Sequence, residues 1–202
     1  MLLRMALIVA LQGVTAPVLA ADFADPTWPC IQRKVETLSA GLMWAAPIDT
    51  AAPQDTADLE KDVREIADLL ALRRLSVDEL RPTVETFAAR YDGNPAVLGQ
   101  VFEDVFTSLN ARRSRIIGGI GDFSLSQIAL SERIEAARMQ MDAQMTADAP
   151  DYDKVDALEE QLDWDQVIFS DRQKSIQYLC ETPVIIEKRL FAIAQMLQQM
   201  IN

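Results

Sequence analysis

Residues 155–200 read VDALEEQLDWDQVIFSDRQKSIQYLCETPVIIEKRLFAIAQMLQQM and carry the longest regular pattern in the chain. From Val155 to Met200, in alternating steps of three and four, eleven of fourteen positions are apolar, and we name these fourteen positions the core stripe. A seven-residue repeat of this length predicts a helix that packs along another helix for most of its course. The exceptions are Asp165, Arg172 and Pro183. We expect the two charged side chains to meet polar groups or water, and the proline to bend the helix because its ring clashes with the preceding turn.

The partner of this helix lies just before it in the sequence. Residues 122–147 hold apolar positions at the same spacing, namely Leu130, Ile134, Ala137 and Met141. The polar segment 148–151 reads as a tight turn, and Asp151 can cap the helix that follows it. Two long helices joined by so short a turn must run antiparallel. The sequence therefore predicts an all-α protein, a helical bundle with a long antiparallel coiled-coil hairpin over residues 122–202 and its turn near 148–151.

Residues 55–121 are predicted to form shorter helices that pack at the base of the hairpin. Ser76 and Glu79 have the spacing of a capping box, and Asn94-Pro95 is typical of a helix start. Glycines 118, 119 and 121 follow the last of these helices. We expect them to break the helix or act as a hinge, since each glycine costs about 1 kcal/mol relative to alanine inside a helix.

The N-terminus reads as a targeting segment followed by an arm. Residues 1–20 combine Arg4, an apolar run and small residues before Ala21, which predicts a cleaved secretory signal peptide and a protein of the periplasm or the extracellular space. The apolar run is too short to span a bilayer of about 30 Å. Residues 21–54 are rich in proline and are expected to form a partly irregular arm with a short helix near 31–43.

Charge and composition restrict the possible partners and chemistries. The chain has 19 Lys and Arg against 31 Asp and Glu, a net charge of -12, which argues against a nucleic-acid partner because such a partner needs cations that neutralise phosphates. It contains no histidine, which removes histidine bases, Ser-His-Asp machinery and histidine-ligated metals. Adjacent carboxylates on a coiled coil are usually solvated surface, so no catalytic residue and no cofactor are expected.

Cys30 and Cys180 are the two cysteines of the chain. In an exported protein two cysteines most simply form one disulfide, with two unpaired buried thiols as the alternative. A bridge between them would pin the arm to the middle of the last helix.

Met139, Met141 and Met145 form the one cluster with possible metal chemistry. Thioethers are soft ligands that suit Cu(I). The alternative is that they fill gaps in the hairpin core, because methionine is common in irregular cores.

Two further features are candidates for contact with another protein. Trp164 lies outside the core stripe, and aromatic residues dominate binding hot spots, although contact with the arm is an alternative. Arg112, Arg113 and Arg115 form a basic cluster in an acidic chain; the alternative is the last turn of a helix, where arginine interacts favourably with the helix dipole.

These observations favour a non-enzymatic exported interaction protein. It would serve as an accessory, scaffold or assembly factor of an envelope complex, with a chaperone-like protein as a subtype. Its partner would be another protein of the cell envelope, and after signal cleavage it would not be integral to the membrane. The alternative function is a small-ligand or Cu(I) binder that uses the methionines of the hairpin.

Overall fold

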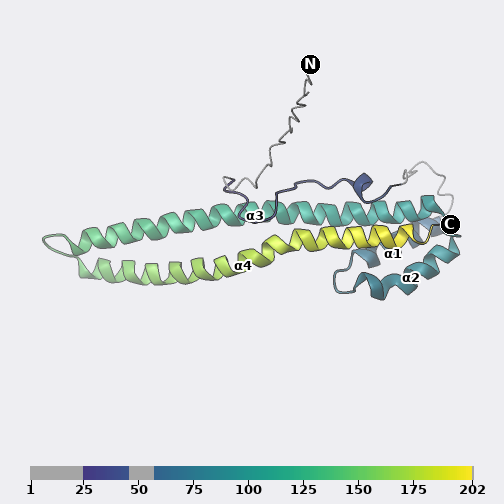
Figure 1. Cartoon of the computed structure of the whole chain (residues 1–202). Coiled ribbons are helices and arrows are strands. Elements are labelled where there is room, and N and C mark those ends of the chain that lie inside the picture. Colours follow the sequence, from purple (N-terminus) through teal and green to yellow (C-terminus); the bar gives the residue numbers. More distant parts are fainter. Residues whose placement is uncertain (1–24, 46–56, 202) are drawn as a thin grey trace, which may run out of the picture.

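A computed structural model describes residues 25–45 and 57–201, and within them the chain forms four α-helices, a short 3-10 helix and no strand (Figure 1). The elements are η1 (Ala40–Leu42), α1 (Ala57–Ala71), α2 (Val77–Arg90), α3 (Pro95–Met145) and α4 (Tyr152–Gln198). The predicted all-α fold with a long hairpin is confirmed. The predicted signal peptide, residues 1–20, lies outside the described residues.

Helices α3 and α4 form the hairpin and run antiparallel through a connection at residues 146–151 (Figure 1). They contain 51 and 47 residues. At about 1.5 Å per residue, each is about 70–75 Å long. The side chain of Asp151 caps α4 by accepting a hydrogen bond from the Lys154 N–H at 3.2 Å.

The core stripe of α4 is buried at most of its predicted positions. They include Val155, Leu158, Leu162, Ile186, Leu190, Ile193 and Leu197. Helix α4 continues without a break through the buried Pro183, and Figure 1 shows that the helix is bent rather than straight. The seven-residue repeat of α4 therefore determines which side of this helix packs against α3.

The hairpin begins earlier than predicted, because the three glycines do not interrupt α3. Asn94 caps this helix by accepting hydrogen bonds from the Ala96 and Val97 N–H groups, and Pro95 is its first residue. The helix then continues through Gly118, Gly119 and Gly121 to Met145. The prediction of a break was wrong because packing of the whole helix against α4 outweighs a local cost of about 1 kcal/mol for each glycine.

Replacing Gly118 or Gly119 by alanine should stabilise the protein. A Cβ built at either position has no heavy atom within 4 Å, so the methyl group costs no clash. Each substitution should raise the free energy of unfolding by about 0.5–1 kcal/mol, measured by urea denaturation. Gly121→Ala should stabilise the protein by a similar amount, since its Cβ would lie 3.4 Å from the Cβ of Thr27, which is an ordinary van der Waals contact. A loss of stability at Gly118 would contradict this reading of an open helix face.

The main core lies at the base of the hairpin, where α1 and α2 pack against the start of α3 and the end of α4. Its fully buried apolar side chains come from all four helices and include Leu70, Val84, Leu98, Phe102, Leu190 and Ile193. Trp44 of the arm stacks on Phe102 with 5.1 Å between ring centroids. Ser76 and Glu79 form the predicted capping box at the start of α2. The expected packing of short helices at this end is thus present for residues 57–90, whereas residues 95–121 belong to the hairpin.

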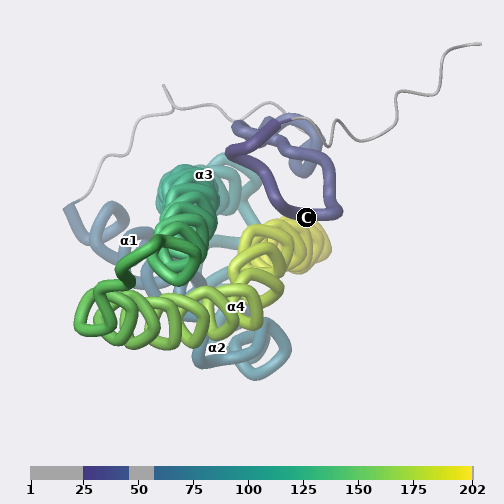
Figure 2. The backbone as a smooth tube through the Cα atoms, turned by 90° about the vertical axis from the view of Figure 1, so that its left-hand side faces the viewer, coloured from purple at the N-terminus to yellow at the C-terminus, as the bar shows by residue number. Residues whose placement is uncertain are grey.

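The described part of the predicted arm, residues 25–45, is extended except for the single turn of η1. It follows one side of the hairpin while α1 and α2 cover the other side (Figures 1 and 2). The predicted helix near 31–43 was wrong. Ile31 and Leu42, which that helix would have buried, are both 85% exposed. The carbonyl groups of Val35 and Glu36, which a helix would use internally, instead accept hydrogen bonds from α3.

Candidate interaction surfaces

A disulfide between Cys30 and Cys180 fastens the arm to α4, as predicted, with 5.5 Å between the two Cα atoms. Both cysteines are buried in a second small core with Trp28 of the arm and Ile117 and Ile120 of α3. The indole N–H of Trp28 donates to the Gln32 carbonyl at 2.6 Å, which shapes the turn of the arm around the bridge. The bridge therefore joins the arm to a packed surface.

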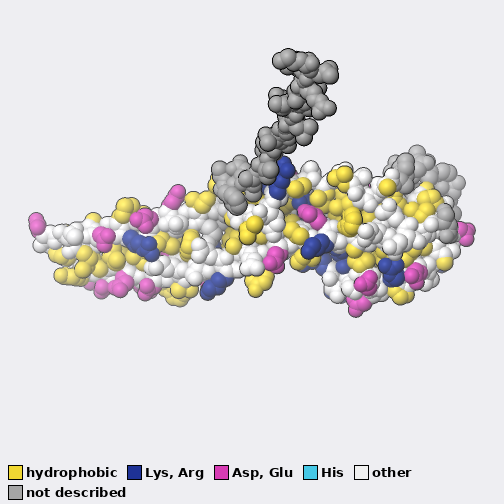
Figure 3. All heavy atoms as spheres, viewed as in Figure 1, with side chains coloured by type: hydrophobic (Ala, Val, Ile, Leu, Met, Phe, Trp, Pro, Cys, Tyr) yellow, Lys and Arg dark blue, Asp and Glu magenta, His cyan; other side chains and the backbone are white. Residues whose placement is uncertain are grey.

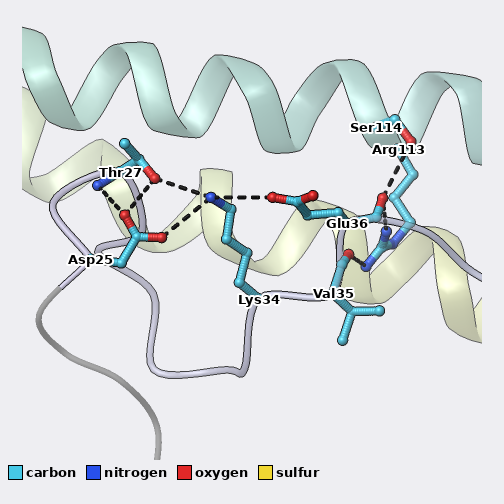
Figure 4. Close-up of polar contacts among 7 residues, drawn as sticks. All are labelled: Asp25, Thr27, Lys34, Val35, Glu36, Arg113 and Ser114. Carbon is cyan, nitrogen blue, oxygen red and sulfur yellow. Dashed lines mark hydrogen bonds and ion pairs between the residues drawn. The ribbon is translucent and has the colours of Figure 1, made fainter.

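The side chain of Arg113 also links the arm to the hairpin, through hydrogen bonds (Figure 4). Its guanidinium donates to the Glu187 carboxylate of α4 at 2.7 Å and to the carbonyl oxygens of Val35 at 2.6 Å and Glu36 at 3.4 Å. The residue is only 2% exposed. The hypothesis that Arg113 contacts another protein is therefore wrong, because its donors face the chain's own arm and helix. The alternative of a last helical turn is also wrong, since α3 runs on to Met145.

The remaining members of the basic cluster differ from Arg113. Arg115 is exposed and Arg112 is half-buried. Neither has an ion-pair partner within 4 Å among the residues that the structure describes. A partner contact at these two arginines stays a prediction.

Near the disulfide the arm is ordered by its own polar contacts (Figure 4). Asp25 accepts hydrogen bonds from the N–H of Thr27 at 2.8 Å and from its hydroxyl at 2.6 Å, and Lys34 reaches Asp25 at 3.3 Å and Glu36 at 3.6 Å. The bonds from Thr27 hold the pKa of Asp25 below its usual value. Ser124 of α3 donates to the Pro26 carbonyl at 2.6 Å. These contacts hold the arm in its path along the hairpin. The carboxylates of Asp25 and Glu36 and the amine of Lys34 bind one another within the arm.

The two charged residues of the core stripe are paired with α3. Arg133 donates to both carboxylate oxygens of Asp165, one at 2.8 Å, and Arg172 donates to the Ser126 hydroxyl at 3.0 Å. Asp165 is 5% exposed. The hydrogen bonds from Arg133 hold the pKa of Asp165 below its usual value. The polar positions of the stripe are therefore hydrogen-bonded to α3 side chains across the hairpin.

Stability should depend on pH through Asp165. Because its pKa is lowered by folding, the carboxylate stabilises the native state fully above its unfolded pKa of about 3.9, and this contribution is lost as the pH falls through the lowered value. Urea unfolding of wild type and Asp165→Asn should show the largest difference above about pH 5 and a shrinking difference below about pH 4. A difference that is constant with pH would contradict an ionised pair at this position.

The methionines of the predicted metal cluster do not share one environment. Met139 and Met145 are 60% and 54% exposed, whereas Met141 packs against the apolar core of the hairpin. Within residues 25–45 and 57–201 no group of three or more Cys, Asp or Glu side chains is placed to hold a metal ion. Cu(I) binding by the methionines stays a prediction, with two thioethers that solvent can reach.

Trp164 lies on an exposed face of α4 together with several acidic side chains. The side chains of one face of α4 line a shallow hollow without an opposite wall, and we name this set the outer face. Its members are Asp156, Glu159, Glu160, Asp163, Trp164 and Val167. Trp164 is 64% exposed and Val167 is 55% exposed, so the described part of the arm, residues 25–45, does not cover the tryptophan. Only Trp164 of these residues was identified from the sequence. The others could have been identified from helical spacing, since positions three, four, seven and eight residues apart share one face of a helix.

A second hollow of about 340 Å³ lies between α3 and α4 beside the disulfide. It is mostly apolar, with Pro29, Phe123, Ile128 and Phe169 among its walls. Gln127 closes part of it by donating to the Phe169 carbonyl at 3.3 Å. The hollow is bordered by the fastened part of the arm.

Comparison with protein-family models, with curated proteins and with solved structures found no match. None of the described helices combines the length and the mean hydropathy needed to cross a bilayer.

Proposed function

We propose that this chain is a non-enzymatic, exported interaction protein of the cell envelope, which acts as an accessory, scaffold or assembly factor. Its working part would be the distal hairpin, which we define as residues 130–168. The observation that carries the proposal is the exposure of Trp164 and Val167 on a rigid helix, at a place that no other described part of the chain covers.

The packing of the distal hairpin supports this role. Its core is made only of α3 and α4 side chains: Leu130, Ile134, Ala137, Leu158 and Leu162, with Met141 and Phe169 partly buried against them. Figure 1 shows this part projecting beyond the arm and beyond helices α1 and α2. A two-helix unit that leaves aromatic and aliphatic side chains in solvent gains stability when a partner covers them.

Export is supported by the disulfide, because such bridges persist in oxidising compartments and are rare in reducing ones. The N-terminal pattern of residues 1–20 favours the same compartment. Together they point to a partner that is met outside the cytoplasm.

The test is site-specific photocrosslinking in the native envelope. p-Benzoylphenylalanine would replace Gln161, which is exposed beside the outer face, and in a control chain it would replace the exposed Glu85 of α2. A discrete adduct of constant mass from position 161, absent from position 85, would support a dedicated partner of the distal hairpin. Many adducts of varied mass from position 161 would favour the chaperone-like subtype. Identical patterns at both positions would remove the distal hairpin as the docking part.

A further inference from the structure

We propose that the outer face of α4 binds a basic amphipathic helix of the partner, which lies along α4 as a third helix. Aliphatic side chains of that helix would contact Trp164 and Val167, and its Lys or Arg residues would face the surrounding carboxylates. This inference rests on the proposed function and adds to it the chemistry and secondary structure of the partner.

Exposed apolar side chains recur along one line of α4. Trp164, Tyr178 and Ile185 are 64%, 74% and 46% exposed and share one heptad position with Asp171, which lies between the first two and pairs with Lys174. In a helix that supercoils with a partner, positions seven residues apart stay on one side, so these three side chains lie along a common outward line. Val167 and Ile168, 55% and 39% exposed, widen the line next to Trp164.

This line is the counterpart of the core stripe on the other side of the same helix. The core stripe at Leu158, Leu162 and Asp165 is buried against α3, whereas the outer face is in solvent. An apolar line with heptad spacing is matched by the i, i+3, i+4 and i+7 side chains of another helix. A peptide that binds by adding a β-strand would need a free sheet edge, and the described residues form no strand. The heptad spacing therefore favours a helix as the occupant.

The distal hairpin is strongly acidic. Residues 130–168 hold eleven Asp and Glu against three Lys and Arg, a net charge of -8 out of -12 for the chain. Figure 3 shows magenta carboxylates beside yellow hydrophobic side chains over this half of the hairpin, at the left of the view. An acidic field of this kind steers a basic partner toward the surface and repels acidic ones.

The carboxylates of the outer face are also free of cations from their own chain. No Lys or Arg nitrogen among the described residues lies within 4 Å of Asp156, Glu159, Glu160 or Asp163. In contrast, Asp165 on the inner side is fully paired with Arg133. Cations of a docking helix would meet unpaired acids and the face of Trp164, which attracts ammonium and guanidinium groups. A second copy of this chain would bring the same negative charge to the surface and is disfavoured.

The experiment uses the full mature protein and two designed peptides as probes. One is a 21-residue helix with Leu at the a and d heptad positions and Lys at the remaining positions, and the other has the same composition in scrambled order. Trp164 is the readout, because it is exposed while Trp28 and Trp44 are 9% and 3% exposed. The ordered peptide should protect Trp164 from acrylamide quenching, and the scrambled peptide should not.

Variants separate specific docking from general attraction. With a labelled peptide and fluorescence anisotropy, Trp164→Ala should weaken binding by about tenfold or more, because an aromatic centre of an interface typically contributes at least that much. The combined changes Glu159→Gln, Glu160→Gln and Asp163→Asn should weaken it by about tenfold, since each removes one charge pair. The matched control changes three exposed acids of the same hairpin away from the outer face, Glu132→Gln, Asp142→Asn and Asp148→Asn, and should lose less than about threefold.

Other results of these experiments would contradict the binding of a basic helix. Equal losses in the two triple variants, or equal binding of the scrambled peptide, would overturn the proposal because charge alone would then explain the affinity. A dimer of the wild-type protein in sedimentation, lost on Trp164→Ala, would assign the face to a second copy and would also overturn it. If the crosslink from position 161 is found but the ordered peptide does not bind, the proposed function stands and the basic helix is wrong.

Discussion

Replacing Cys30 and Cys180 together by serine should lower the free energy of unfolding by about 4–5 kcal/mol, since this is the chain-entropy value for a loop of this length. The bridge joins residues 150 positions apart, so almost the whole described chain is a closed loop in the oxidised unfolded state. Opening that loop gives the unfolded ensemble many more conformations. The measurement is urea denaturation of the double variant beside the oxidised wild type, followed by far-ultraviolet circular dichroism.

The control for this prediction is the wild type reduced with dithiothreitol. It should unfold at nearly the same urea concentration as the double variant, since both lack the crosslink and differ only in sulfur and oxygen at two buried positions. Limited proteolysis should cut both proteins more readily within residues 31–37, where the arm is mostly exposed. A change in the free energy of unfolding below about 1 kcal/mol would contradict the prediction and would mean that residual structure keeps the two cysteines close in the unfolded ensemble even without the bridge.

The parts of the fold that could be predicted are those set by local sequence. The core stripe follows from the periodicity of one helix, and the caps at Ser76, Asn94 and Asp151 are each formed by residues within three positions of the capped helix. The disulfide followed from the number of cysteines and the expected compartment. None of these inferences required knowledge of which distant segments meet.

The parts that could not be predicted depend on distant segments. The continuity of α3 through Gly118 and Gly119 rests on packing against α4, which outweighs the low helix propensity of glycine. The extended arm rests on acceptors that Arg113 engages from 77 and 78 residues away. The burial of Arg113, which the sequence places in an exposed basic cluster, has the same cause. Sequence patterns show which side of a helix is apolar. They do not show which charged side chain is buried and hydrogen-bonded to a residue distant in the sequence.

The two halves of the hairpin differ in how they are covered, and this difference links the fold to the proposed function. Near the base, α3 and α4 are packed by α1, α2, Trp44 and the fastened arm. Among the described residues, the two helices of the distal hairpin pack only against each other, with a thin apolar core and an ion pair in which Asp165 is buried and Arg133 is exposed. The base of the hairpin is stabilised by these contacts and supports the distal hairpin. In the distal hairpin, Trp164 and its acidic neighbours remain accessible to a partner. A partner that binds there would meet a surface already held in shape.

Arg113→Ala should destabilise the protein by about 3 kcal/mol, because it removes a buried guanidinium, its packing, and its donors to one carboxylate and two carbonyl groups. The substitution would strip Glu187 and the carbonyl oxygens of Val35 and Glu36 of donors that lie in a buried position.

Two variants make the role of Arg113 specific. Arg113→Lys should recover only part of the loss, since a single ammonium group cannot reproduce three directed donors of the planar guanidinium. Arg115→Ala, two positions along α3 and exposed, should change the free energy of unfolding by no more than about 0.5 kcal/mol. Urea denaturation of all three beside the wild type provides the measurement. If Arg113→Ala costs no more than Arg115→Ala, the arm is held by the disulfide and Trp28 alone, and the buried arginine is not a fastening.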